Sequence, residues 1–133
     1  MQPIRKHNFF ILAGTSGTGK TTVLSQLRSR QWFIGFDEAA RTVLEQQLAI
    51  QGPALPSNSP QLFIEAMQAN NLEAFAKANQ PNTIYVTDRG LPDLIHYAIR
   101  FNIDPTNFQQ VAQQYLYNQC VFMFPPWPEI FKF

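Results

Sequence analysis

Four short apolar runs along the chain alternate with longer stretches in which apolar residues recur every three or four positions. The runs span residues 9–13, 32–36, 83–87 and 120–124. Their nearly continuous apolar character is typical of strands covered on both faces, as in a parallel sheet. The stretches between them have the periodicity of amphipathic helices. Strands that alternate with helices predict an α/β fold with a mainly parallel sheet.

Helix-start signals divide the remaining chain into five predicted helices. We expect them over about residues 20–30, 37–51, 60–79, 92–99 and 105–116. The third and fifth helices follow Ser59-Pro60 and Asp104-Pro105, a capping residue and then a proline that suits the first helical turn. The apolar face of the fifth helix is predicted to include Tyr115 and Leu116.

Composition narrows the class of protein. The 133 residues are 45% hydrophobic and 14% charged, which suits one folded domain and argues against disorder. A net charge of +1 gives no general electrostatic case for binding nucleic acid or a membrane surface. The single cysteine, Cys120, cannot form an intrachain disulfide and is expected in the core of the fourth strand. We therefore expect a cytoplasmic protein without a membrane segment.

A glycine-rich segment directly follows the first strand and matches the Walker A pattern, with Gly14, Gly19, Lys20 and Thr21 at the required spacing. Glycines let successive backbone N–H groups face an anion, and the following helix adds the positive end of its dipole. Lys20 would contact the β- and γ-phosphates, and the Thr21 hydroxyl would bind Mg²⁺. The alternative is a turn that only joins strand to helix. The predicted nucleoside triphosphate site comprises Gly14, Thr15, Ser16, Gly17, Thr18, Gly19, Lys20, Thr21 and Thr22.

Asp88 and Arg89 follow the third strand, at the sheet edge where ligands of open α/β sheets bind. Asp88 resembles the acid of a Walker B strand and could hold Mg²⁺, although it could also only cap a loop. Arg89 suits an acceptor phosphate or transition-state charge, and a surface arginine is the alternative.

Asp37, Glu38 and Arg41 follow the second strand and should face the same edge. Acids at a helix start also complement the helix dipole, so Asp37 and Glu38 have a purely structural explanation. A base for an acceptor hydroxyl would nevertheless be needed here, and we favour Glu38 for it. Met67 lies at helical spacing and is expected in the core or at the wall of an acceptor pocket.

Four segments of the sequence resemble a family of small bacterial P-loop proteins. The segments are residues 9–22, 37–41, 88–93 and 125–127. Members of the family are described as AAA-domain ATPases, or as predicted kinases related to the nicotinamide-riboside-kinase domain of NAD metabolism. The resemblance implies a P-loop NTPase fold with three α/β/α layers and the strand order 2-3-1-4-5. It also places Glu38 and Arg41 on the acceptor side, and turns Asp88 and Arg89 toward metal and acceptor.

The resemblance is incomplete beyond residues 125–127. Family members continue into an arginine-bearing lid, a fifth strand and a last helix, whereas this sequence ends at Phe133. We therefore expect a single domain over residues 1–133, with the order 2-3-1-4 and without those elements. The fourth strand would then be an apolar sheet edge, which an oligomer could cover.

These features favour a Mg²⁺–ATP-dependent kinase that phosphorylates a small, nucleoside- or riboside-like acceptor. The expected catalytic residues are Lys20, Glu38, Asp88 and Arg89, and Arg41 or Arg89 would bind negative charge on the acceptor. An ATPase that couples hydrolysis to a conformational or partner change is an alternative, as is a nucleotide-binding module without catalysis. The sequence has no Asn-Lys-x-Asp segment, which favours ATP over GTP.

Overall fold

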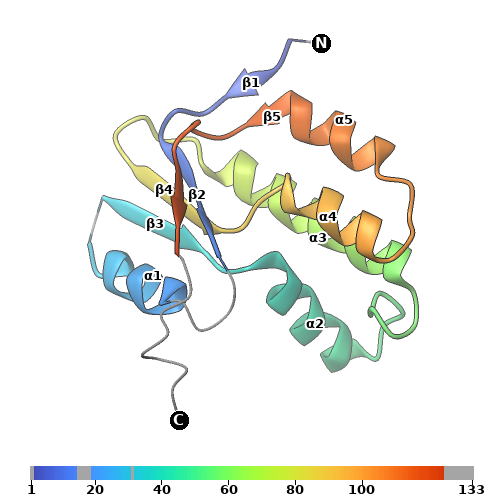
Figure 1. The fold of residues 1–133 in the computed structure, drawn as a ribbon. Coiled ribbons are helices and arrows are strands. Elements are labelled where there is room, and N and C mark those ends of the chain that lie inside the picture. The colour runs from blue at the N-terminus through green and yellow to red at the C-terminus, as the bar shows by residue number, and fades with distance from the viewer. Residues whose placement is uncertain (1, 15–18, 31, 125–133) are drawn as a thin grey trace.

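A parallel sheet forms the centre of the computed structural model, which describes residues 2–14, 19–30 and 32–124 (Figure 1). Its strands in the described residues are β2 (Phe9–Ala13), β3 (Phe33–Phe36), β4 (Ile84–Asp88) and β6 (Val121–Met123). They lie in the order β3-β4-β2-β6, and every pair is parallel. Counted along the chain, this is the predicted order 2-3-1-4, so the expected fold class is confirmed.

The helices cover the two faces of this sheet unequally (Figure 1). On one face lies α1 (Lys20–Arg28), where Leu24 packs with Leu12 and Val86. A larger cluster on the other face joins the sheet to four helices. These helices are α2 (Ala39–Ile50), α3 (Pro60–Lys77), α4 (Asp93–Arg100) and α5 (Thr106–Gln114). The result is the three-layer α/β/α arrangement.

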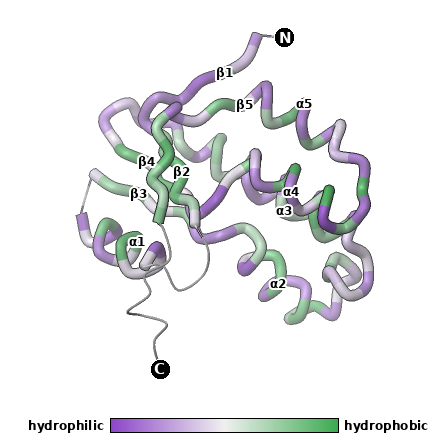
Figure 2. Tube along the Cα trace, in the orientation of Figure 1, coloured by the Kyte–Doolittle hydropathy of each residue, from purple (hydrophilic) through white to green (hydrophobic). Residues whose placement is uncertain are grey.

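Alternation along the central strands explains why both faces are covered. Phe9 and Tyr85 belong to the larger cluster, whereas Leu12 and Val86 belong to the smaller one. Figure 2 shows the two central strands as largely apolar, whereas hydrophilic and hydrophobic residues alternate along the helices. No helix of the described residues is long and apolar enough to cross a membrane.

A small second sheet departs from the sequence prediction. In it β1 (Ile4–Arg5) pairs in parallel with β5 (Tyr115–Leu116). The predicted extension of the fifth helix through Leu116 is therefore wrong, since α5 ends at Gln114. Pairing with β1 and an edge-on contact between the rings of Tyr115 and Phe75, with centroids 5.5 Å apart, favour an extended backbone here.

Cys120 also differs from its predicted place in the core. It is exposed and precedes β6, which lies at the edge of the described sheet. The side chains of Val121, Phe122 and Met123 are themselves 41%, 47% and 68% exposed among the described residues. An edge strand with one described neighbour does not bury its residues as a central strand does, which is why the prediction for Cys120 is wrong.

Tyr117 connects the sheet to the segment that follows β4. Its ring meets that of Phe9 edge-on, with centroids 4.8 Å apart, and its hydroxyl accepts a hydrogen bond from the Leu91 amide at 3.2 Å. A Cβ on Gly90 would lie 2.9 Å from the Tyr117 hydroxyl, so the close approach requires glycine. Burial raises the pKa of Tyr117, which keeps the phenol neutral.

We expect Tyr117→Phe to lower the free energy of unfolding at pH 7 by about 1–3 kcal/mol, because the buried Leu91 amide loses its partner. The ordinary pKa of tyrosine is 10.0, and folding raises that of Tyr117. The associated stability is present below pH 10 and is lost as the pH rises further, because the unfolded chain ionises first. Urea unfolding should therefore show the wild type losing about 1.4 kcal/mol more than the variant between pH 9 and 11. If the wild type and the variant lost the same free energy of unfolding over this pH range, the Tyr117 phenol would be exposed to solvent.

Candidate functional site

The described ends of the glycine-rich segment have backbone conformations that suit a tight loop. Gly14 has a φ of +133° and Gly19 a φ of +94°, and α1 begins at Lys20. A Cβ on Gly14 would overlap the carbonyl oxygen of Phe124, which leaves glycine as the residue that fits. The remaining predicted loop residues lie outside the described part of the chain; they are Thr15, Ser16, Gly17 and Thr18.

Lys20 and Asp88 form a buried ion pair at the carboxyl edge of the sheet. Lys20 Nζ lies 3.0 Å from Asp88 Oδ1, and the two side chains are only 5% and 8% exposed. Lys20 also donates a hydrogen bond to the Gly14 carbonyl oxygen at 2.5 Å. Apart from this ion pair, Asp88 Oδ1 has no hydrogen-bond partner among the described residues. This carboxylate oxygen therefore retains capacity for another ligand.

Arg89 is held in an unfavourable backbone conformation directly beside this pair. Its φ is +61°, which is uncommon for a residue with a side chain. Its amide donates to the Leu12 carbonyl at 3.0 Å, and its own carbonyl accepts from Thr87 Oγ1 at 2.8 Å. The guanidinium donates from Nη2 to the Gly14 carbonyl at 3.0 Å. Together these contacts hold Arg89 at the carboxyl ends of the paired strands β2 and β4.

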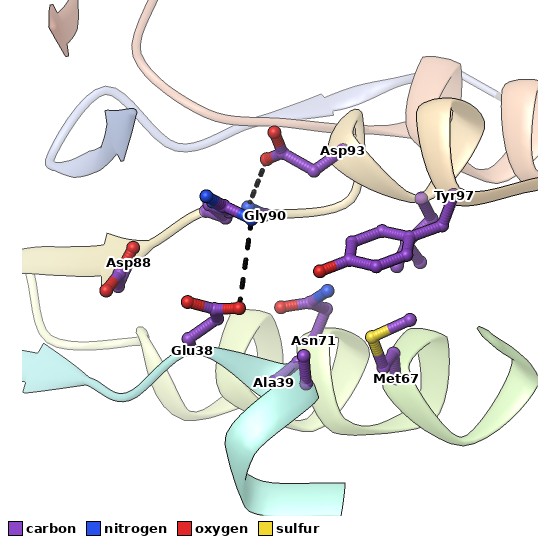
Figure 3. A pocket seen from close by; sticks show the side chains of 11 residues that line it. Glu38, Ala39, Met67, Asn71, Asp88, Gly90, Asp93 and Tyr97 are labelled. Atoms are coloured by element: carbon purple, nitrogen blue, oxygen red, sulfur yellow. Dashed lines mark hydrogen bonds and ion pairs between the residues drawn. The ribbon is translucent and has the colours of Figure 1, made fainter. Parts of the chain in front are cut away.

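Glu38 lies just before α2 and lines the same cleft as Arg89. Figure 3 shows the Glu38 carboxylate directed into this cleft. Glu38 Oε1 is 3.8 Å from Arg89 Nη1, and both side chains are partly buried. Asp37 instead pairs with Arg28 at 2.9 Å on the exposed side. Glu38 is thus the carboxylate that the start of α2 presents to the cleft.

The other predicted residues lie farther from this cluster. Thr21 and Thr22 are exposed on the first turn of α1, next to Lys20 in sequence. Arg41 is exposed on the first turn of α2 and is not part of the cleft wall. The structure therefore brings Lys20, Asp88, Arg89 and Glu38 together, and leaves Arg41 outside.

The cleft between Glu38 and Arg89 extends between α3 and α4 and has a cavity volume of about 10 Å³, roughly the room for one water molecule (Figure 3). Met67 forms part of its wall, as the sequence allowed. Asn71 and Tyr97 also line it and were not predicted. A second hollow of about 150 Å³ shares Arg89, Asp93 and Tyr97 with the cleft. The two hollows together offer more room than the cleft alone.

The donor set fits a magnesium ion that arrives with a nucleotide. Mg²⁺ prefers oxygen ligands and usually keeps several water and phosphate oxygens, so it needs few protein ligands. Asp88 Oδ1 is a buried carboxylate oxygen without a hydrogen-bond partner in the described residues. In that part of the chain, no three His, Cys, Asp or Glu side chains converge as a metal site. Asp88, with the Thr21 hydroxyl as second candidate, therefore suits this cation better than a metal held by the protein alone.

The fold and the Walker A spacing define a P-loop NTPase-type domain. A family model described as an AAA domain matches residues 9–132, and the chain belongs to this family. Comparison with curated proteins and with solved structures yields no match. P-loop AAA domains generally bind nucleotide, commonly with Mg²⁺, so family membership supports a nucleotide-binding domain. The narrower resemblance to nicotinamide-riboside kinases stays a prediction.

The buried ion pair gives a stability prediction for the nucleotide-free chain. Asp88→Ala leaves the Lys20 charge buried without its counter-ion, and we expect the free energy of unfolding to fall by about 3 kcal/mol. Urea denaturation without nucleotide measures this change.

The matched control is Glu73→Ala, which removes an ion pair with Lys77 whose side chains are each 64% exposed. That change should cost less than about 1 kcal/mol. Equal effects of the two substitutions would show that the Lys20–Asp88 pair is solvated in solution.

Proposed function

We propose that this protein is a kinase that transfers the γ-phosphate of Mg²⁺–ATP to a hydroxyl group of a small, nucleoside- or riboside-like acceptor. The observation that carries the proposal is the position of Glu38. Its carboxylate lies 3.8 Å from Arg89, the residue that follows the Lys20-paired Asp88. A candidate base, a guanidinium and the Walker A lysine thus occupy adjoining strand ends around one cleft.

The nucleotide would be bound by the glycine-rich segment from Gly14 to Thr22. Lys20 would exchange its contacts with Gly14 and Asp88 for phosphate oxygens, because these contacts already place its charge at the loop. Asp88 and Thr21 would hold Mg²⁺, which neutralises charge on the phosphates when bound. The absence of an Asn-Lys-x-Asp segment from the sequence supports ATP over GTP.

Glu38 would accept the proton of the acceptor hydroxyl while the oxygen of that hydroxyl attacks the γ-phosphorus. The bond from that phosphorus to the β–γ bridging oxygen would break, and ADP would leave with the electron pair of that bond. Arg89 would stabilise the charge on the transferring group, since its guanidinium lies between Gly14 and Glu38. Arg41, exposed on α2, is our candidate for binding an anionic group of a larger acceptor.

An ATPase is the second candidate, and the description of the matching family as an AAA domain favours it. An ATPase would need the cleft only for a water molecule. The adjoining hollow of about 150 Å³ beside Arg89, Asp93 and Tyr97 offers room for a larger acceptor and supports the kinase instead.

Labelled ATP distinguishes the two activities. The protein is incubated with γ-labelled ATP, Mg²⁺ and one of a panel of nucleosides, ribosides or nucleoside monophosphates. We expect label to appear in one class of acceptor. Phosphate release that is independent of every acceptor would support the ATPase, and no turnover would contradict both.

We expect Glu38→Gln to lower kcat at least 100-fold because the amide cannot take up the proton, while the Kd for ATP changes less than twofold. The control is Glu45→Gln, an exposed acid on the same helix, which should leave kcat unchanged. Lys20→Ala should instead abolish ATP binding in calorimetry. Full kcat in Glu38→Gln would remove Glu38 as the base.

A further inference from the structure

The hollow beside the cleft is lined mainly by basic side chains. Its lining residues are Arg89, Asp93, His96, Tyr97 and Arg100. One water molecule needs about 10–15 Å³ of cavity volume, so a hollow of about 150 Å³ has room for a much larger group. Three of the lining residues also line the cleft, and the hollow therefore continues the candidate site outward.

The charges around the hollow favour an anion. Arg89 and Arg100 contribute two positive charges against the one carboxylate of Asp93, whereas the whole chain has a net charge of only +1. The Asp93 carboxylate is already engaged, because its Oδ2 accepts a hydrogen bond from the Gly90 amide at 2.8 Å (Figure 3). Asp93 also lies in the first turn of α4, where the helix dipole stabilises a negative charge.

His96 and Arg100 offer hydrogen-bond donors to this hollow. They are one helical turn apart on α4, which places them on the same face of the helix. Within the described residues, neither side chain forms an ion pair. An arginine in the last turn also complements the helix dipole, but that contact explains neither His96 nor the hollow between them and Arg89.

Arg89 connects the hollow to the proposed reaction centre. Its guanidinium donates to the Gly14 carbonyl at 3.0 Å and lies 3.8 Å from Glu38, and the same side chain lines the hollow. The cleft beside Glu38 has a cavity volume of about 10 Å³, which suits one hydroxyl oxygen. The rest of an acceptor would then occupy the hollow, which is the larger of the two spaces.

A phosphate monoester matches the donors of the hollow better than a carboxylate does. It has three terminal oxygens and a charge of about −1.5 to −2 at pH 7, whereas a carboxylate has two oxygens and a single charge. Each guanidinium can bind two phosphate oxygens at once. The His96 ring and the Tyr97 hydroxyl add further donors for the oxygens that remain.

We propose that this hollow binds a phosphate monoester carried by the acceptor. The substrate class would then be a phosphorylated riboside, such as a nucleoside monophosphate, with its phosphate in the hollow and a free hydroxyl in the cleft. The inference rests on the proposed function for the statement that this ligand is the phosphoryl acceptor. Binding of the phosphate ester itself does not depend on phosphoryl transfer.

Calorimetry on the full chain tests this preference without turnover. The nucleotide site is first filled with Mg²⁺ and a non-hydrolysable ATP analogue, so that an added phosphate ester cannot bind to the glycine-rich segment. The probes are ribose, ribonate, ribose 5-phosphate, and the four common nucleosides with their 5′-monophosphates. We expect at least one phosphate ester to bind about tenfold more tightly than its unphosphorylated partner, because of its charge-assisted hydrogen bonds. The carboxylate of ribonate should improve on ribose by less than about threefold.

Arg100→Gln removes one positive charge from the hollow. It should weaken the preferred phosphate ester about tenfold and leave the unphosphorylated partner and the ATP analogue within about twofold. Arg30→Gln is the matched control, since Arg30 is an exposed arginine after α1 that does not line the hollow. The control should leave the affinity for the phosphate ester unchanged.

Asp93→Asn changes the charge in the opposite direction. The amide oxygen can still accept from the Gly90 amide, while the negative charge beside the ligand is lost. We expect the phosphate ester to bind about threefold more tightly, because a like charge is removed. A purely structural role of α4 would weaken binding in both variants instead, and melting temperatures show whether each variant is folded.

Four results would each overturn the inference. They are the absence of any gain from a phosphate group in the wild type, an equal gain from the carboxylate of ribonate, unchanged affinity for the phosphate ester in folded Arg100→Gln, and weaker binding in folded Asp93→Asn.

The same proteins in the labelled-ATP assay separate this inference from the proposed function. Binding of a phosphate ester that depends on Arg100 but leads to no labelled product would support the inference and contradict the kinase. Labelled product formed equally from phosphorylated and unphosphorylated acceptors, by wild type and Arg100→Gln alike, would support the kinase and contradict the inference.

Discussion

The carbonyl oxygen of Gly14 receives hydrogen bonds from two cationic side chains, and the rest of the site is arranged around it. Lys20 reaches it from α1 and Arg89 from the end of β4. Both charges are thereby fixed at the point where β2 ends and the glycine-rich segment begins. The Asp88 carboxylate balances the positive charge of Lys20. Arg89 keeps its unusual positive φ because several hydrogen bonds hold it in place at once. A polyphosphate would meet positive groups that are already in position, which lowers the cost of organising them.

The strand order could be predicted from the sequence, because buried parallel strands read as continuous apolar runs and because the family resemblance supplied the topology. The pairing of β1 with β5 could not be predicted from the sequence. Tyr115 and Leu116 continue the apolar stripe of α5, so local periodicity favours helix for them. Their extended conformation depends on Ile4 and Arg5, more than a hundred residues away, and no local pattern contains that contact.

The site was predictable where it depends on strand ends. Polar residues that follow parallel strands meet at one edge, which is why Asp88, Arg89 and Glu38 could be named together. Tyr97 was not predictable, because its direction depends on how α4 packs against α3. Asn71 did leave a signal, since it interrupts the buried stripe of α3 one turn after Met67. A polar residue at such a position indicates the wall of a cleft only when the opposing helix is known.

The lack of a side chain at position 14 has a consequence for how this domain can be studied genetically. The Phe124 amide donates to the Ala13 carbonyl, and the Phe124 carbonyl lies where a Cβ of residue 14 would be. Any larger residue there would push the end of β6 away from β2 as well as distort the nucleotide loop. Loss-of-function alleles at this codon would therefore mix a folding defect with a ligand defect.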